Sequence, residues 1–274
     1  MPIKSILIAS DLSERSDRAI KRGLMLARSL GAEATLGCIV DDDMPEDMVS
    51  ERVERSEAHL EASMKELGGG LSCQVAVRVG EPVSRLVSLV NGKHHDLVVV
   101  GRHRTREMFD GLRRTTVESV VSQSLKPVLL VAGPVHGPYE RVLAPVAFSM
   151  ACRSAVALAR EVAPGAGERV FHAWMAPFEG LSRGGDDGLK KAVEREIREQ
   201  ARTWAAGLDP APEVKLRHGG VTPRLEAELR AFVPDLLAVG ANTRALSFTG
   251  VGAFTSELIR HPPTDLLISR ATTP

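Results

Sequence analysis

Two short apolar runs in the first half of the chain are each followed by residues that could bind a polar ligand. Asp11 follows the run Lys4–Ser10, and Gly101 follows the run Asp96–Val100. A carboxylate at Asp11 can accept hydrogen bonds from a ribose or from an adenine amine. A glycine at position 101 lets a ligand approach the backbone closely. The alternative interpretation is that Asp11 caps the turn or helix that follows it.

The tract after Gly101 carries a local excess of positive charge. Over Arg102–Arg114, five arginines oppose only Glu107 and Asp110, an excess of three. A helix that begins near the end of this tract would offer backbone N–H groups, with the hydroxyls of Thr115 and Thr116, to a phosphate. Three interpretations stay open: an anion or nucleotide site, a solvated surface loop, and a contact with an acidic partner.

Both segments occur twice in the chain. Ser5–Ser13 (SILIASDLS) matches Arg141–Ser149 (RVLAPVAFS), and Asp96–His103 (DLVVVGRH) matches Asp235–Asn242 (DLLAVGAN). The matching positions lie 136 and 139 residues apart, and a repeat of this period indicates two copies of one domain. We expect a first copy at residues 1–133 and a second copy at residues 139–274, joined by a short, turn-rich linker.

Apolar runs of strand length alternate with amphipathic segments of helix length in both copies. This order predicts an α/β fold of two tandem doubly wound domains, each a five-stranded parallel sheet flanked by helices. The expected strands are Lys4–Ser10, Ala34–Val40, Cys73–Val79, Asp96–Val100 and Val128–Val131, then Arg141–Val146, Arg169–Trp174, Glu213–Arg217, Leu236–Val239 and Asp265–Ser269.

The composition excludes several classes of protein. Lys plus Arg and Asp plus Glu number 35 each, so no global charge favours nucleic acid or a membrane surface. No apolar run reaches about 18 residues, and the amino-terminal residues do not read as a signal peptide. The three cysteines form no C-x-x-C pair, which favours reduced thiols in the cytoplasm. Neither a metal site nor a catalytic constellation is expected, and His94 and His95 are expected on a solvent-facing loop.

The chain resembles the universal stress protein family in its tandem, UspA-like form. The matching stretches in the first copy are ILIASDLSERSDRAIKRGLMLA, GEPVSRLV and DLVVVGRH, and those in the second are LAPVAFSMACRSAVALA, DLLAVGAN and SELIRHPPTDLLIS. The resemblance covers essentially the whole chain. It implies a Rossmann-like fold of the adenine nucleotide alpha hydrolase-like type.

Nucleotide-binding members of that family carry an Asp after the first strand and a G-x-x-G-x9-G-[ST] motif after the fourth. The first copy keeps the Asp, the first glycine and the hydroxyl, and has arginines in place of the second and third glycines. By resemblance, Ile39 lies beside the adenine. The residues implied to bind the nucleotide are Ala9, Ser10, Asp11, Ile39, Val100, Gly101, Arg104, Arg114, Thr115 and Thr116.

The second copy departs further from the family motif. Ala147 stands where the first copy has Asp11, Thr243 replaces the second motif glycine, and Gly252–Ala253 takes the place of the glycine and hydroxyl. The carboxylate and the hydroxyl are therefore both missing. The resemblance implies that this copy does not bind ATP in the family manner.

The resemblance implies a stress-response binding and regulatory module and not a dedicated enzyme. The expected ligand is ATP or another adenine nucleotide in the first copy, with Mg only where the nucleotide brings it. Alternatives are a nucleotide-free scaffold or interaction protein that uses the Arg102–Arg114 loop, and a weak ATPase. The two copies are expected to pair through Lys126–Val131 and Thr264–Ser269 as an intramolecular pseudo-dimer. A homodimer of whole chains in the cytoplasm is also considered.

Overall fold

Strands and helices alternate within each repeat of the computed structural model, which describes residues 2–92, 95–102, 116–176, 187–241 and 251–270. The chain forms two compact units. The first contains residues 1–138 and 247–268, and the second contains residues 139–246 and 269–274. The doubly wound α/β fold expected for each repeat is confirmed.

The first unit contains a parallel sheet whose strand order reverses near its middle. The order is β3-β2-β1-β4-β5, so the chain moves outward in one direction from β1 and in the other from β4. Every neighbouring pair in this series is parallel. The strands are β1 (Ser5–Ala9), β2 (Glu33–Val40), β3 (Cys73–Val79), β4 (Leu97–Gly101) and β5 (Val128–Val131).

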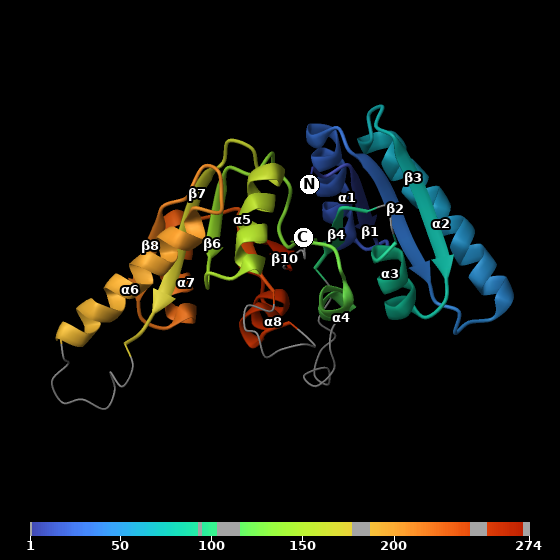
Figure 1. Ribbon diagram of the computed structural model, residues 1–274. Helices are drawn as coiled ribbons and strands as arrows, with labels where there is room; N and C mark the ends of the chain where they lie inside the picture. Colours follow the sequence, from blue (N-terminus) through green and yellow to red (C-terminus); the bar gives the residue numbers. More distant parts are fainter. Residues whose placement is uncertain (1, 93–94, 103–115, 177–186, 242–250, 271–274) are drawn as a thin grey trace. The chain divides into compact units, whose positions relative to one another are not determined.

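Helices cover both faces of this sheet. On one face α1 packs against β1 and β4, and α2 packs against β2 and β3 (Figure 1). On the other face α3 contacts β2 and α4. Strand β2 shows that one face of the sheet is covered more fully than the other. Its even-numbered residues from Ala34 to Val40 are all buried, whereas Thr35 and Ile39 are partly exposed. The helices are α1 (Glu14–Leu30), α2 (Glu46–Leu67), α3 (Pro82–Val90) and α4 (Thr116–Gln123).

Helix α1 has strong signals at both ends. The hydroxyl of Ser13 accepts a hydrogen bond from the backbone N–H of Ser16, and Glu14 and Asp17 place negative charge in the first turn. Gly31 ends the helix in the left-handed conformation, with φ of 63°. The position of this helix on the sheet matters for the functional site below.

The second unit repeats the arrangement with a parallel sheet in the order β9-β6-β7-β8. Helix α5 packs against β6 and β9, α6 packs against β8, and α7 contacts β6 and β7. The elements are β6 (Arg141–Pro145), α5 (Met150–Val162), β7 (Gly167–Trp174), α6 (Asp187–Ala205), β8 (Val214–His218), α7 (Val221–Phe232) and β9 (Leu236–Gly240).

The last helix and strand of the chain belong to the first unit. Strand β10 (Asp265–Ser269) pairs antiparallel with β5, with Leu267 opposite Leu129. Helix α8 (Ala253–Arg260) contacts α4, where the guanidinium of Arg260 lies 2.9 Å from the buried carboxylate of Glu118. The expected pairing of the two last strands is thus observed. The repeat boundary and the boundary of the compact units therefore fall at different places.

A buried ion pair holds the start of β10. Arg22 of α1 and Asp265 have side chains that are only 6% exposed, and their closest N and O atoms are 3.4 Å apart. Asp265 also accepts hydrogen bonds from the backbone N–H groups of Ala132 and Gly133, at 2.8 and 3.3 Å. Arg22 donates to the carbonyl of Gly137 at 2.7 Å. This cluster joins α1, β10 and the linker between the repeats.

Removing one partner of this buried ion pair should destabilise the fold much more than removing one partner of a surface ion pair. Asp265→Ala leaves the Arg22 guanidinium buried without its carboxylate, which typically costs about 3–5 kcal/mol. Glu51→Ala is the matched control, because Glu51 pairs with Arg55 at the surface and should stay within about 0.5 kcal/mol of wild type. Urea unfolding measures both, and equal effects would contradict the importance of the buried pair.

A second buried carboxylate holds α7 onto its sheet. Glu228 accepts hydrogen bonds from Arg169 of β7, at 3.0 Å, and from Arg217 of β8. The guanidinium carbon of Arg169 also lies 4.2 Å from the ring centre of Phe232. Burial raises the pKa of Glu228, but the hydrogen bonds and charges of the two arginines lower it further, to below its ordinary value.

The lowered pKa makes stability depend on pH in a defined window. A carboxyl whose folded pKa is depressed stabilises the fold above its unfolded pKa, about 4.3, and this contribution is lost as pH falls through the folded value. Wild type should therefore lose more unfolding free energy between pH 6 and pH 3 than Glu228→Gln, which should lack about 2 kcal/mol at pH 6. Glu226→Gln, on the exposed face of the same helix, should behave like wild type. Identical pH profiles for wild type and Glu228→Gln would contradict this account.

Candidate functional site

A cavity of about 500 Å³ lies at the carboxyl ends of β1, β2 and β4. This is where the strand order reverses, and open parallel sheets bind ligands at that position. Residues from α1, α2, α3 and α4 complete the walls. The lining residues are Ala9, Ser10, Asp11, Leu12, Ser16, Gly37, Cys38, Ile39, Val40, Asp41, Met44, Arg52, Ser56, Pro82, Leu86, Val100, Gly101, Arg102, Thr116, Val117 and Val120.

Asp11 lies at the rim of this cavity and is exposed. Its Oδ1 atom accepts hydrogen bonds from the hydroxyl of Ser13, at 2.6 Å, and from the backbone N–H of Ser13, at 3.0 Å. Burial raises the pKa of Asp11, but the bonds from Ser13 outweigh it and hold the pKa below its ordinary value. A carboxylate has acceptor sites for about four hydrogen bonds, so Asp11 keeps capacity for a ligand while it positions the helix cap.

The turn after β1 is strained in the same way in both copies. Leu12 has a φ of 61°, and Phe148, at the corresponding position after β6, has a φ of 55°. Such values are uncommon for residues with a side chain. The hydroxyl of Ser10 accepts a hydrogen bond from the N–H of Leu12 and donates to Ser16, so Ser10 stabilises the turn. Since the second copy lacks the carboxylate, this turn serves the fold of both copies.

Gly101 is required by the packing of a helix. A Cβ atom at this position would lie 2.9 Å from the carbonyl oxygen of Arg15 and 3.1 Å from the Cα of Ser16. The first turn of α1 therefore packs directly on the backbone of Gly101. At Gly240 in the second copy, a Cβ would lie 2.5 Å from the backbone nitrogen of Cys152. The structure thus gives a packing reason for the glycine that the sequence interpretation attributed to ligand approach.

Of the other residues expected at the nucleotide site, some line the cavity and the rest lie outside the described residues. Ala9 and Val100 are buried in the cavity wall, while Ile39 and Thr116 are partly exposed to it. Together with Ser10, Asp11 and Gly101 they surround one cavity. The remaining three, Arg104, Arg114 and Thr115, lie outside the described residues.

The cavity also contains residues that the sequence did not single out. Arg52 and Ser56 stand one turn apart on α2 and face the cavity, and the hydroxyl of Ser56 donates to the carbonyl of Arg52 at 2.6 Å. Cys38 lies beside them, and burial raises the pKa of its thiol. The signal available in the sequence was the place of Ser56, three residues after Val53 and four before Leu60, on the apolar side of the helix; the structure buries it. With Arg102, Arg52 gives the described part of the cavity two guanidinium groups.

Aromatic side chains gather at the corresponding place in the second copy. Phe148 stacks on His172, with ring centres 4.2 Å apart, and Trp204 of α6 lies 6.1 Å from Phe148. The Nδ1 of His172 is 2.7 Å from the carbonyl oxygen of Val146, and burial lowers the pKa of this histidine. The backbone N–H of Ala147 meets the sulfur of Cys152 at 3.4 Å. The register makes His172 the counterpart of Cys38, so a different set of groups occupies this region.

Methyl groups at the two glycines test the packing explanation. Gly101→Ala and Gly240→Ala should each lower the free energy of unfolding by about 1–3 kcal/mol, because the helix must move away from its sheet. Gly133→Ala is the control, because nothing lies within 4 Å of its added Cβ. Chemical denaturation without nucleotide compares the three variants. Unchanged stability in both helix-contact variants would contradict the packing explanation.

Neither a membrane helix nor a metal cluster is found in the part of the chain that the structure describes. No helix there combines the length and apolarity that crossing a bilayer requires. Within the same ranges, no group of three or more His, Cys, Asp or Glu side chains is placed to hold a metal ion.

Comparisons with known proteins agree with the repeated fold. The model of the universal stress protein family matches residues 2–132 and again residues 138–270. A universal stress protein from Archaeoglobus fulgidus is similar over 98% of both chains, with a TM-score of 0.70 and 18% identity. A putative universal stress protein from Pseudomonas aeruginosa is similar over 98% of this chain and 93% of its own, with a TM-score of 0.69 and 16% identity. None of the curated proteins matches the chain. The chain therefore belongs to the universal stress protein family and contains two copies of its domain in tandem.

Proposed function

We propose that the first copy binds an adenine nucleotide and that the protein is a binding and regulatory module in a stress response, not a dedicated enzyme. The observation that carries this proposal is the cavity of about 500 Å³ at the reversal of the strand order, with Asp11 at its rim. A volume of this size is in the range of small-molecule sites.

The cavity offers different chemistry to the parts of a nucleotide. Ile39, Val40 and Val100 supply apolar surface for the base, and Asp11 accepts hydrogen bonds from ribose or base. The guanidinium groups of Arg52 and Arg102 favour the phosphates, since arginine presents a planar fork of donors to anionic oxygens. Arg104, Arg114 and Thr115 are proposed to extend the phosphate site. Mg would be bound only through the nucleotide.

The second copy is proposed not to bind a nucleotide in this way. Ala147 supplies no carboxylate, and Phe148, His172 and Trp204 form a packed aromatic cluster at the corresponding place. The repeats at residues 1–133 and 139–274 are proposed to form an intramolecular pseudo-dimer, which the pairing of β5 with β10 supports. A homodimer of whole chains and a cytoplasmic location stay predictions.

Calorimetric titration with ATP, ADP and AMP tests the nucleotide site. Asp11→Ala should weaken the affinity at least about tenfold, because a hydrogen bond to a charged group contributes about 1.5–3 kcal/mol. Ser13→Ala is the control for the helix cap, since it removes a partner of Asp11 and keeps the carboxylate. It should weaken binding much less than Asp11→Ala.

Two results would count against this proposal. One is an absence of binding to wild type at millimolar nucleotide, which favours a nucleotide-free scaffold. The other is an Asp11→Ala variant with the affinity of wild type.

A further inference from the structure

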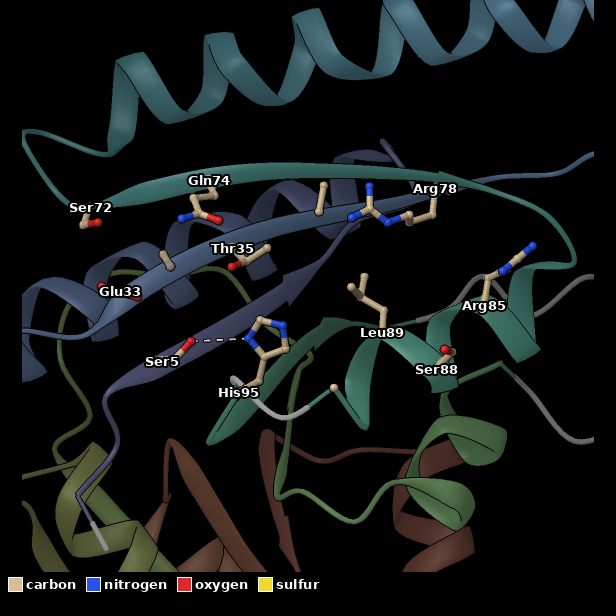
Figure 2. A pocket seen from close by; sticks show the side chains of 13 residues that line it. Ser5, Glu33, Thr35, Ser72, Gln74, Arg78, Arg85, Ser88, Leu89 and His95 are labelled. Carbon is tan, nitrogen blue, oxygen red and sulfur yellow. Dashed lines mark hydrogen bonds between the residues drawn. The ribbon is translucent and has the colours of Figure 1, made fainter.

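A second cavity, of about 530 Å³, lies on the sheet face that α3 covers only in part. Figure 2 shows side chains from β2, β3 and α3 around it, with Arg78 of β3 pointing over the sheet toward its middle. His95 and Ser5 lie at the amino ends of β4 and β1, where the His95 Nδ1 is 3.3 Å from the Ser5 hydroxyl. His95 is only 7% exposed, so its expected place on a solvent-facing loop is wrong. The ring lies against the start of β1, at the Ser5 hydroxyl.

The strand register identifies the counterpart of each lining residue in the second copy. Arg78 pairs in register with Ile39, and Arg217 pairs with Ala173 at the corresponding position. Residues of β1 correspond to residues of β6 that lie 136 positions later in the chain. The strand pairings then give the corresponding residues on the neighbouring strands of each copy. On the helices, the repeat distance of 139 residues makes Glu228 the counterpart of Leu89.

In the second copy a carboxylate and a large aromatic side chain occupy this region. Arg217 and Arg169 both donate to the carboxylate of Glu228. Phe171, which is fully buried, occupies the position that corresponds to Gly37 in the first copy. Arg217 of β8 therefore has beside it a carboxylate from α7.

In the first copy the arginine is kept and the carboxylate is not. Leu89 replaces the glutamate, and Gly37 adds no side chain, so Leu89 lies over its backbone. The only hydrogen bond that Arg78 makes among the described residues is to the carbonyl of Val77, at 3.1 Å. Glu33 also lines the cavity, but it lies six residues along β2 from the register partner of Arg78, a separation of about 20 Å. Among the residues that the structure describes, no carboxylate is therefore paired with the arginines at this end of the cavity.

We propose that this cavity binds a small organic carboxylate, whose carboxylate group takes at Arg78 the place that the Glu228 carboxylate takes at Arg217. Arg85 lines the same end, with its side chain over Gly80 and its guanidinium turned away from Arg78 (Figure 2). Thr35 and Gln74, which are register partners on β2 and β3, offer a hydroxyl and an amide to polar groups of the ligand. Leu89 and Ala76 supply apolar surface for its carbon skeleton. This site is separate from the proposed nucleotide site and does not depend on it.

Succinate is the probe, and its binding is followed by NMR of the ¹⁵N-labelled full-length protein at constant ionic strength. Succinate should change the chemical shift of the Arg78 Nε–H group, and the change should saturate as succinate is added. Dimethyl succinate, which has no charge, should leave this chemical shift unchanged. Arg78→Gln should weaken the affinity about tenfold or more, as read from backbone signals of β3, because a charge-assisted hydrogen bond is lost. Arg55→Gln, an exposed substitution on α2, is the matched control and should bind like wild type.

Leu89→Glu provides the second test, because it restores the carboxylate of the second copy beside Arg78. It should abolish succinate binding, while Leu89→Gln, of the same shape without the charge, should keep it. Non-saturating shifts with wild type would overturn the proposal. So would equal binding of succinate and its diester, or unchanged affinity in the folded Arg78→Gln and Leu89→Glu variants. Nucleotide titration of the same variants should match wild type.

Discussion

The first copy depends on the close packing of α1 against the backbone of Gly101. A Cβ at that position would lie 2.9 Å from a carbonyl oxygen of the helix, so only glycine allows this approach. The contact brings the first turn of α1 beside the carboxyl ends of β1 and β4, where the strand order reverses. This contact positions Asp11, Ser13 and the cavity wall. The same constraint acts at Gly240, so both copies share this scaffold.

Because the scaffold is shared, the side chains around it carry the differences in chemistry. At the carboxyl edge of the sheet, the first copy has Asp11 and an open cavity, whereas the second has Ala147 beside stacked aromatic rings. On the face under α3 and α7, the first copy has an arginine without a carboxylate, and the second has the same arginine bound to Glu228. In both places the second copy satisfies internally the groups that we propose the first copy offers to a ligand.

The sequence predicted most of the fold because the pattern of apolar residues determines a parallel sheet. Strands β3, β5 and β10 have the predicted bounds, and other predicted strand ends differ by two residues or fewer. Asp11 and Gly101 were singled out because they follow predicted strands, and Ile39 and Val100 because of the family resemblance; all four line the cavity. Arg52, Ser56 and the buried His95 were missed, because a helix face or a loop reveals its neighbours only after the chain folds. The reason for Gly101 also needed the structure, since a clash with α1 depends on backbone positions far apart in sequence. The exchange of Glu228 for Leu89 between the copies could also not be interpreted from the sequence. Only the strand register shows that each of these residues belongs beside an arginine of the sheet.

The central claim is that one chain holds one adenine nucleotide, in its first copy. Equilibrium dialysis of the full chain against radiolabelled ATP, at saturating concentration, measures this number directly. The account predicts one nucleotide per chain for wild type. Two nucleotides per chain would show that the second copy binds as well, and none would show that the cavity beside Asp11 does not hold ATP; either result would overturn the proposal.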